Sequence, residues 1–125
     1  VIEGEEKLAV SHNNADTFTI TTGRGNVPSG LGYDLISVLA TKNKLTGKPR
    51  LFVLNRDYSA DKTITVTLDG YTPGNGKVYL YNNADLLKNN EANPHNAITV
   101  VESTQSFSDP LVITIPAHSF KRIDF

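Results

Sequence analysis

Alternation of apolar and polar residues is the clearest pattern in this chain. Between residues 62 and 68, Ile64, Val66 and Leu68 alternate with threonines. Because successive side chains of a strand point to opposite faces, this pattern predicts a strand with one buried face. Shorter runs rich in β-branched and aromatic residues predict further strands. They lie at residues 7–10, 17–21, 51–54, 78–81, 98–101, 111–115 and 120–125.

Turn-forming residues separate these segments at short intervals. Glycine, proline and asparagine, which accept positive φ or fix φ in advance, are concentrated there. Asn75-Gly76 predicts the tightest hairpin turn, since both residues accept the left-handed region. Many short strands with such spacing predict an all-β fold, an antiparallel β-sandwich of jelly-roll-like type. Residues 1–125 are expected to form this single domain.

Two segments depart from the simple all-β pattern. Residues 29–40 carry apolar residues at helical spacing behind a serine that is able to cap a helix. The same segment contains two early glycines, and Ile36, Val38 and Ala40 alternate as on one face of a strand. We expect a strand, with a helix as the alternative. Residues 84–88 predict a single helical turn.

Composition limits the size and the class of the protein. Its 125 residues suffice for one domain, and 12 basic against 13 acidic side chains give a net charge of −1. Nucleic acid is not an expected partner, since its binders carry a basic stripe. A membrane is not expected either, because no apolar run approaches the roughly 18 residues of a span. The absence of cysteine excludes disulfides and a cysteine nucleophile.

The N-terminus gives no evidence of a targeting signal. Residues 1–6 are acidic where a signal peptide is basic, and methionine is absent from the whole chain. Either an initiator methionine has been removed or these residues are a piece of a longer protein, and we expect the second. A secreted and a cytoplasmic bacterial protein are both consistent with the sequence.

One glycine-rich turn is similar to a dinucleotide-binding motif. Gly23-Arg24-Gly25 follows the strand predicted at residues 17–21, but the third glycine of the fingerprint is replaced by Pro28. No further βαβ unit follows. We expect a turn without a ligand, and no cofactor.

The acidic residues do not form an evident catalytic pair. Hydrolysis of a glycosidic bond needs two carboxyl groups across a pocket about 5 to 10 Å wide. Most acids of the central and C-terminal parts lie in predicted turns or at strand ends, and a small sandwich has no deep cleft to raise their pKa. No catalytic residue is assigned. The acids concerned are Asp57, Asp61, Asp69, Asp85, Glu91, Glu102, Asp109 and Asp124.

Two other groups of residues have side chains suited to catalysis or to metal binding. His118 and Ser119 are consecutive at a predicted strand, so they point to opposite faces and are not base and nucleophile for each other. Asn55, Asp57 and Asp61 place oxygen ligands around one loop, as a calcium site requires. The same residue types are the usual material of turns, so no metal is expected.

Tyrosines are the candidates for carbohydrate binding, because the chain has no tryptophan. Tyr79 and Tyr81 share one face of a predicted strand, about 7 Å apart. Tyr58 and Tyr71 lie in predicted loops. Such residues suit a sugar-stacking platform, a contact with a neighbouring domain, or the core of a two-sided sheet. The sequence leaves these three roles open and favours stacking least.

A series of short motifs covers the last two-thirds of the chain. They are a strand at 33–40, a charged hairpin at 42–48, a strand ending in Asn55-Arg56, the alternating strand 64–68, Asp85-Leu86, an asparagine-rich turn with Asn93-Pro94, and Pro116-Ala117-His118-Ser119-Phe120. In order and spacing they resemble the C-terminal β-sandwich domain of the alpha-L-arabinofuranosidases of glycoside hydrolase family 51.

The resemblance implies a non-catalytic accessory domain. In that family the catalytic glutamates lie in a (β/α)8 barrel outside this region, so no catalytic residue is transferred to this chain. The resemblance also implies an edge that the parent chain covers, and an exposed edge invites pairing. The partner expected on this basis is the catalytic barrel domain of a parent that acts on arabinose-containing plant polysaccharides. An autonomous carbohydrate-binding module, which would bind plant cell-wall polysaccharide itself, and an adhesin-like structural domain are the alternatives.

Overall fold

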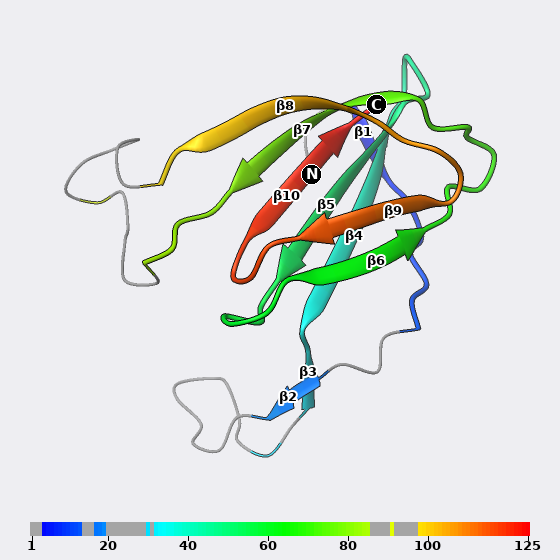
Figure 1. Cartoon of the computed structure of the whole chain (residues 1–125). Coiled ribbons are helices and arrows are strands. Elements are labelled where there is room, and N and C mark those ends of the chain that lie inside the picture. The colour runs from blue at the N-terminus through cyan, green and yellow to red at the C-terminus, as the bar shows by residue number, and fades with distance from the viewer. Residues whose placement is uncertain (1–3, 14–16, 20–29, 31, 86–90, 92–97) are drawn as a thin grey trace.

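The computed structural model describes residues 4–13, 17–19, 30, 32–85, 91 and 98–125. In this part of the chain it shows ten strands and no helix, so the all-β, antiparallel, sandwich-like fold is confirmed (Figure 1). No helix of the length and apolarity needed to cross a membrane occurs in it. The strands are β1 (Glu5–Lys7), β2 (Thr17–Thr19), β3 (Gly32–Asp34), β4 (Ile36–Asn43), β5 (Pro49–Asn55), β6 (Lys62–Val66), β7 (Asn75–Tyr81), β8 (Val100–Ser106), β9 (Leu111–Ile115) and β10 (Phe120–Asp124).

Six of the strands form one antiparallel sheet, in the order β1-β4-β5-β10-β7-β8. At its centre β10 lies between β5 and β7, so that Ile123 is opposite both Leu51 and Val78. These three side chains are almost fully buried. The C-terminal strand therefore closes the middle of the sheet rather than its edge.

A second layer made of β6 and β9 covers one face of this sheet, which we call the inner face (Figure 1). The two strands pair antiparallel, with Ile64 opposite Ile113. Between the layers lies the hydrophobic core, and fully burying one such aliphatic side chain stabilises the fold by about 1.5–3 kcal/mol. Its residues are Ile36, Ala40, Leu51, Val53, Val78, Leu111, Ile113, Ile115 and Ile123.

The second layer leaves part of the inner face open. Within the described residues β6 pairs only with β9, so the other edge of β6 has no strand partner. Beside that edge lies a groove of about 910 Å³, bounded also by residues 8–13. Its apolar lining comes mainly from β4 and β6, with Ile36, Val38, Ala40, Ile64 and Val66. Whether a parent chain covers this edge of β6, as the family resemblance implies, stays a prediction.

The segment that fitted two elements is extended. Gly32–Asp34 and Ile36–Asn43 are strands, so a strand is the correct choice for residues 32–40. β4 continues beyond residue 40 because it pairs along its length with β5. The helical turn predicted at residues 84–88 lies largely outside the described residues, and Ala84 and Asp85 are not helical.

The hairpin turn predicted at Asn75-Gly76 is wrong. Both residues begin β7, where they lie opposite Ser106 and Gln105 of β8. A Cβ atom at Gly76 would come within 3.1 Å of Phe107 Cε2. Glycine is required here for close packing rather than for a left-handed backbone.

Strand boundaries also differ where a neighbouring strand extends the pairing. The segment predicted at 98–101 is a strand over Val100–Ser106, because β8 pairs with the whole of β7. The weak candidate at 7–10 contributes only Lys7 to β1.

Candidate functional site

The structure separates the four candidate tyrosines. Tyr79 and Tyr81 lie on β7 and share the face of the six-stranded sheet that is turned away from β6 and β9, which we call the outer face. Tyr71 packs against Phe125 beside the core, with ring centroids 5.8 Å apart. Tyr58 is 72% exposed in the loop after β5. Only the first two are therefore part of one surface.

Tyr81 belongs to a row of aromatic rings on the outer face. Its ring centroid lies 5.4 Å from that of Phe120, with the two planes tilted by 54°. Phe120 is in turn stacked on Phe52, with centroids 6.2 Å apart. The register explains the row, because Phe120 of β10 is opposite Tyr81 of β7 and Leu54 of β5. Leu39 of β4 extends it, opposite Phe52 and 41% exposed.

Tyr79 has a different neighbour. The guanidinium carbon of Arg122 lies 4.1 Å from the centroid of the Tyr79 ring, which is a cation–π contact. Register again brings the two together, since they are directly opposite on β10 and β7. One face of the Tyr79 ring is therefore already covered by a protein side chain.

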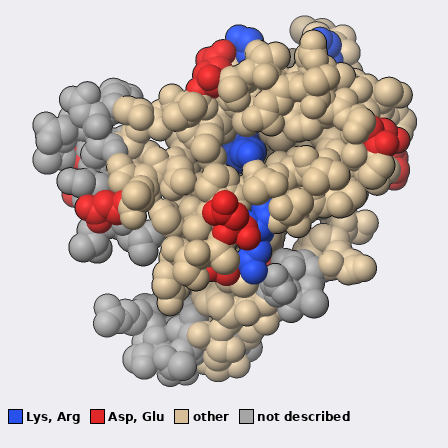
Figure 2. All heavy atoms as spheres, in the orientation of Figure 1, with Lys and Arg blue, Asp and Glu red and all other residues tan. Residues whose placement is uncertain are grey.

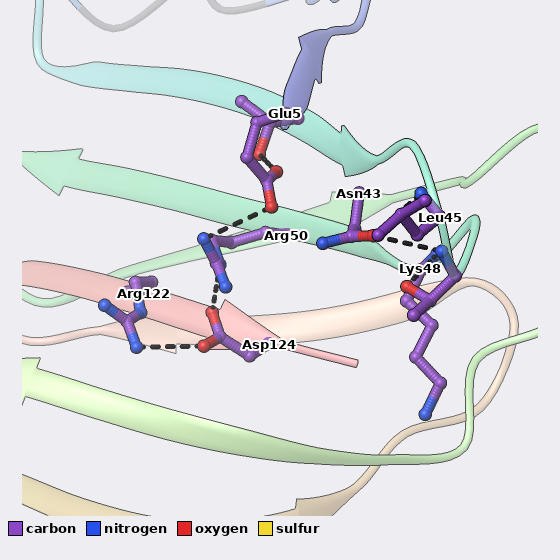
Figure 3. Close-up of polar contacts among 9 residues, drawn as sticks. Glu5, Asn43, Leu45, Lys48, Arg50, Arg122 and Asp124 are labelled. Atoms are coloured by element: carbon purple, nitrogen blue, oxygen red, sulfur yellow. Dashed lines mark hydrogen bonds and ion pairs between the residues drawn. The ribbon is translucent and has the colours of Figure 1, made fainter. Parts of the chain in front are cut away.

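A row of ion pairs crosses the outer face and holds Arg122 in place (Figure 3). The Nη2 atom of Arg122 donates to Oδ2 of Asp124 at 2.9 Å. The other carboxylate oxygen of Asp124 accepts a bond from Nε of Arg50 at 2.7 Å. Arg50 Nη1 lies 3.4 Å from the buried carboxylate of Glu5, which also accepts a 2.6 Å bond from Thr41. The row joins β1, β5 and β10, whose residues are far apart in the sequence.

A second ion pair lies nearer the sheet edge. Lys77 Nζ donates to Glu102 Oε1 at 3.1 Å, and this bond raises the pKa of the Lys77 ammonium group above its ordinary value. Both side chains are more than half exposed, so the pair adds little to stability.

Asn55 has a structural role that the sequence did not reveal. Its side chain is 1% exposed. The amide nitrogen donates to the carbonyl oxygens of Ala60, Ile115 and Pro116 at 3.0–3.1 Å, and Oδ1 accepts a bond from the amide of Asp57. Asn55 therefore ties the end of β5 to the connection between β9 and β10, and both ends of its amide are occupied.

The other two candidate calcium ligands are also bound to protein donors. Asp57 Oδ1 accepts bonds from the amides of Ser59 and Ala60, and its Oδ2 lies 3.4 Å from Lys62 Nζ. The bond from the Ser59 amide is the main cause that lowers the pKa of Asp57. Asp61 Oδ1 accepts a bond from the amide of Ala117. The described residues contain no group of three or more His, Asp or Glu placed to hold a metal ion.

His118 and Ser119 make separate structural contacts. The Ser119 hydroxyl is buried and donates to the carbonyl of Pro116 at 2.7 Å. The His118 ring lies between two carbonyl oxygens, with Nε2 2.6 Å from Asn83 O and Nδ1 3.2 Å from Tyr58 O. Both residues lie in the connection before β10 rather than on a strand, so the opposite-face argument does not apply to them, and the partners of their side chains differ.

The acids do not converge in the large groove. Asp69 is the one carboxylic acid among the described residues that line it, whereas glycosidic hydrolysis uses two. A smaller hollow of about 230 Å³ beside Tyr81 likewise has one acid among its described lining residues, Asp85. The Gly23-Arg24-Gly25 turn lies outside the described residues.

Charge is dispersed on the face that carries β6 and β9. In Figure 2 the lysine and arginine side chains of that face form small separate groups, divided by uncharged atoms. This pattern differs from the continuous basic stripe of nucleic-acid binders.

Comparison with known proteins gives a match in fold. No family model and no curated protein matches the sequence. The family 51 arabinofuranosidase of Xanthomonas axonopodis pv. citri matches with a TM-score of 0.66 and 20% identity, over 87% of this chain and 21% of that chain. The thermostable family 51 alpha-L-arabinofuranosidase of Thermotoga petrophila RKU-1 matches with a TM-score of 0.69 and 15% identity, over 78% and 20% of the two chains. This chain has the fold of a family 51 arabinofuranosidase β-domain.

The β-domain fold also occurs in another glycoside hydrolase family. A family 44 xyloglucanase of Paenibacillus polymyxa matches with a TM-score of 0.55 and 18% identity, over 72% of this chain and 16% of that chain. This chain spans about a fifth of the length of the arabinofuranosidases it matches. The likeness therefore concerns one domain of larger hydrolases, and at these identities it concerns the fold alone.

Proposed function

We propose that this chain is a non-catalytic accessory domain of a glycoside hydrolase that acts on arabinose-containing plant polysaccharides. The observation that carries the proposal is the match of its fold to about one fifth of family 51 arabinofuranosidase chains. The position of the acids supports it, since the groove offers the single carboxyl group of Asp69 among its described lining residues.

The role proposed for the domain is to support a catalytic barrel in the same polypeptide. Among the described residues the second layer consists of the two strands β6 and β9, which agrees with this role. A two-stranded ribbon is marginal on its own, and the groove beside β6 exposes apolar side chains that a neighbouring segment would cover. A domain with these properties gains stability from, and gives stability to, the chain around it.

Activity measurements on the full polypeptide test the proposal. The complete gene product is expected to release arabinose from arabinan and arabinoxylan, whereas residues 1–125 alone release none. Deletion of these residues is expected to shorten the half-life of thermal inactivation. The variant Asp69→Asn, made in the full polypeptide, is expected to leave the rate of arabinose release unchanged. A complete gene product without glycosidase activity, or hydrolysis that depends on Asp69, would refute the proposal.

Binding measurements separate this function from a carbohydrate-binding module. We expect no saturable binding of arabinoxylan or arabinan oligosaccharides to residues 1–125 in calorimetric titration. Stacking on a sugar requires a free ring face, but Tyr79 is covered by Arg122 and Tyr81 packs on Phe120. Saturable binding that Tyr81→Ala abolishes, with the fold retained, would favour the binding module instead.

A further inference from the structure

The central strand β5 is apolar on both faces. Leu51 and Val53 point into the core, while Phe52 and Leu54 alternate with them and lie on the outer face, half-buried. In an antiparallel sheet of a sandwich the face away from the core is commonly polar and solvated. The outer face of β5 differs from this pattern, because Phe52 and Leu54 are apolar.

The apolar residues of the outer face are contiguous across four neighbouring strands. We call them the outer-face patch. Pairing in the sheet places each beside the next, and the ring contacts show that the aromatic members touch. The patch consists of Leu39 of β4, Phe52 and Leu54 of β5, Phe120 of β10 and Tyr81 of β7. Alternation with the buried Leu51, Val53, Val78 and Ile123 places it on the face opposite to the core. Figure 1 shows β6 and β9 over the other face.

Charges beside the patch are already paired within the sheet (Figure 3). The Glu5–Arg50–Asp124–Arg122 row and the Lys77–Glu102 pair contain three acids and three bases. The net charge of these six side chains is therefore zero. Ion pairs within the sheet already fix the positions of the two arginines. Apolar aromatic centres with arginine at the margin are typical of protein–protein interfaces.

The occupant that fits the patch is protein rather than glycan. Phe52 and Phe120 stack on each other, Tyr81 is tilted against Phe120, and Arg122 covers Tyr79. These contacts engage ring surface that stacking on a sugar would need. About four-fifths of each matched arabinofuranosidase chain lies outside this domain. The partner is therefore expected to be another domain of the same polypeptide.

We infer that the outer-face patch is the surface on which this domain docks against the catalytic domain of its own polypeptide. The inference rests on the proposed function, and it adds the surface by which the accessory domain contacts the catalytic domain. The docking partner is a largely apolar surface with few unpaired charges, because the charges of the outer face have partners of their own. Tethering in one chain keeps the partner at high effective concentration, so a small interface suffices.

The test is hydroxyl-radical footprinting of the full polypeptide, with and without a charge in the patch. The variant Leu39→Glu places the charge, and Val112→Glu is the matched control, since Val112 is an exposed valine of β9 in the other layer. We expect Phe52, Tyr81 and Phe120 to be oxidised several-fold faster in Leu39→Glu than in wild type. Val112→Glu is expected to leave their rates unchanged.

Internal standards show whether the variant is folded. Leu51, on the inner face of the same strand, is expected to stay unreactive in all three proteins. Tyr58, in its exposed loop, gives the reference rate. If Leu51 becomes reactive in Leu39→Glu, the milder variant Leu39→Gln replaces it under the same criteria.

The outcomes separate the inference from the proposed function. An active hydrolase in which the patch residues react equally fast in wild type and variant would overturn the inference alone. Patch protection that is lost on dilution of a dimer would assign the surface to a second copy and also overturn it. A full polypeptide without glycosidase activity would instead refute the proposed function, and the inference with it.

Discussion

Replacement of Asn55 tests the tie between β5 and the β9–β10 connection. Asn55→Ala removes the donor shared by three carbonyl oxygens and the acceptor for one backbone amide. The bond to Ile115 is fully buried and the others are partly buried, so water replaces some of them. Full loss for the first and partial loss for the rest give a destabilisation of about 3 kcal/mol. This is a large share of the roughly 5–15 kcal/mol by which a domain is stable.

Asn55→Asp is expected to destabilise the fold more than Asn55→Ala at neutral pH, although aspartate and asparagine have nearly the same size and shape. The carboxylate has no N–H to donate and faces three carbonyl oxygens. These surroundings raise the pKa of the new carboxyl group in the folded state. The folded variant then binds a proton that the unfolded chain has released, so its stability falls as pH rises from about 4 through that raised pKa.

Urea unfolding at pH 7 and at pH 4.5 measures these effects for the wild type and each variant. The matched control is Asn43→Asp (Figure 3), because the Asn43 side chain acts through Oδ1, which accepts bonds from the amides of Leu45 and Thr46. An aspartate performs the same task there, so we expect little change. A loss below about 1 kcal/mol for Asn55→Ala, or equal losses for the two aspartate variants, would refute the reasoning.

Two further predictions concern buried positions. Gly76→Ala is expected to destabilise by roughly 1–3 kcal/mol in urea unfolding, since the new Cβ would lie 3.1 Å from Phe107 Cε2 and 3.2 Å from Ile123 Cγ2. Gly74→Ala, with open space around its Cβ, is the control, and equal effects would contradict the packing argument. Lys121 is 8% exposed, and burial lowers the pKa of its ammonium group below 10.5. The unfolded chain then keeps a proton that the folded chain has lost, so wild-type stability rises with pH between that lowered pKa and 10.5. Lys121→Met is expected to remove this rise, and parallel stability profiles of the two proteins would exclude it.

Much of the strand content was predictable because its signal is local. Alternation marks residues 62–68 without reference to any partner, since the side-chain period of a strand is two. A run rich in β-branched residues marks Leu111–Ile115 in the same local way. The strand over residues 32–40 was correctly preferred on the same ground. Strand ends were less predictable. β8 runs to Ser106 because β7 provides partners for it, and pairing is a tertiary property.

The candidate site depended more strongly on the tertiary structure. The sequence placed Tyr79 and Tyr81 on one face, and that placement is confirmed. It carried no signal that Arg122 would cover Tyr79. Nor did it indicate that Asn55 would bind the carbonyls of Ile115 and Pro116, about 60 residues further along the chain. The turn predicted at Asn75-Gly76 was wrong for the same reason. Gly76 leaves space for the side chain of Phe107, a residue remote in the sequence.

The sequence by itself determined which segments are extended and which residues share a face, because both follow from neighbouring side chains. It also marked residues 51–54 as an apolar run, which the sheet order then made a central strand with apolar side chains on both faces. The tertiary structure alone decided which strands lie side by side, and hence which charges pair across the outer face. In the described part of the chain it also left one edge of β6 without a strand partner, beside a groove. Hydrogen-bonded pairing joins residues remote in the chain, so only the folded sheet brings their side chains together.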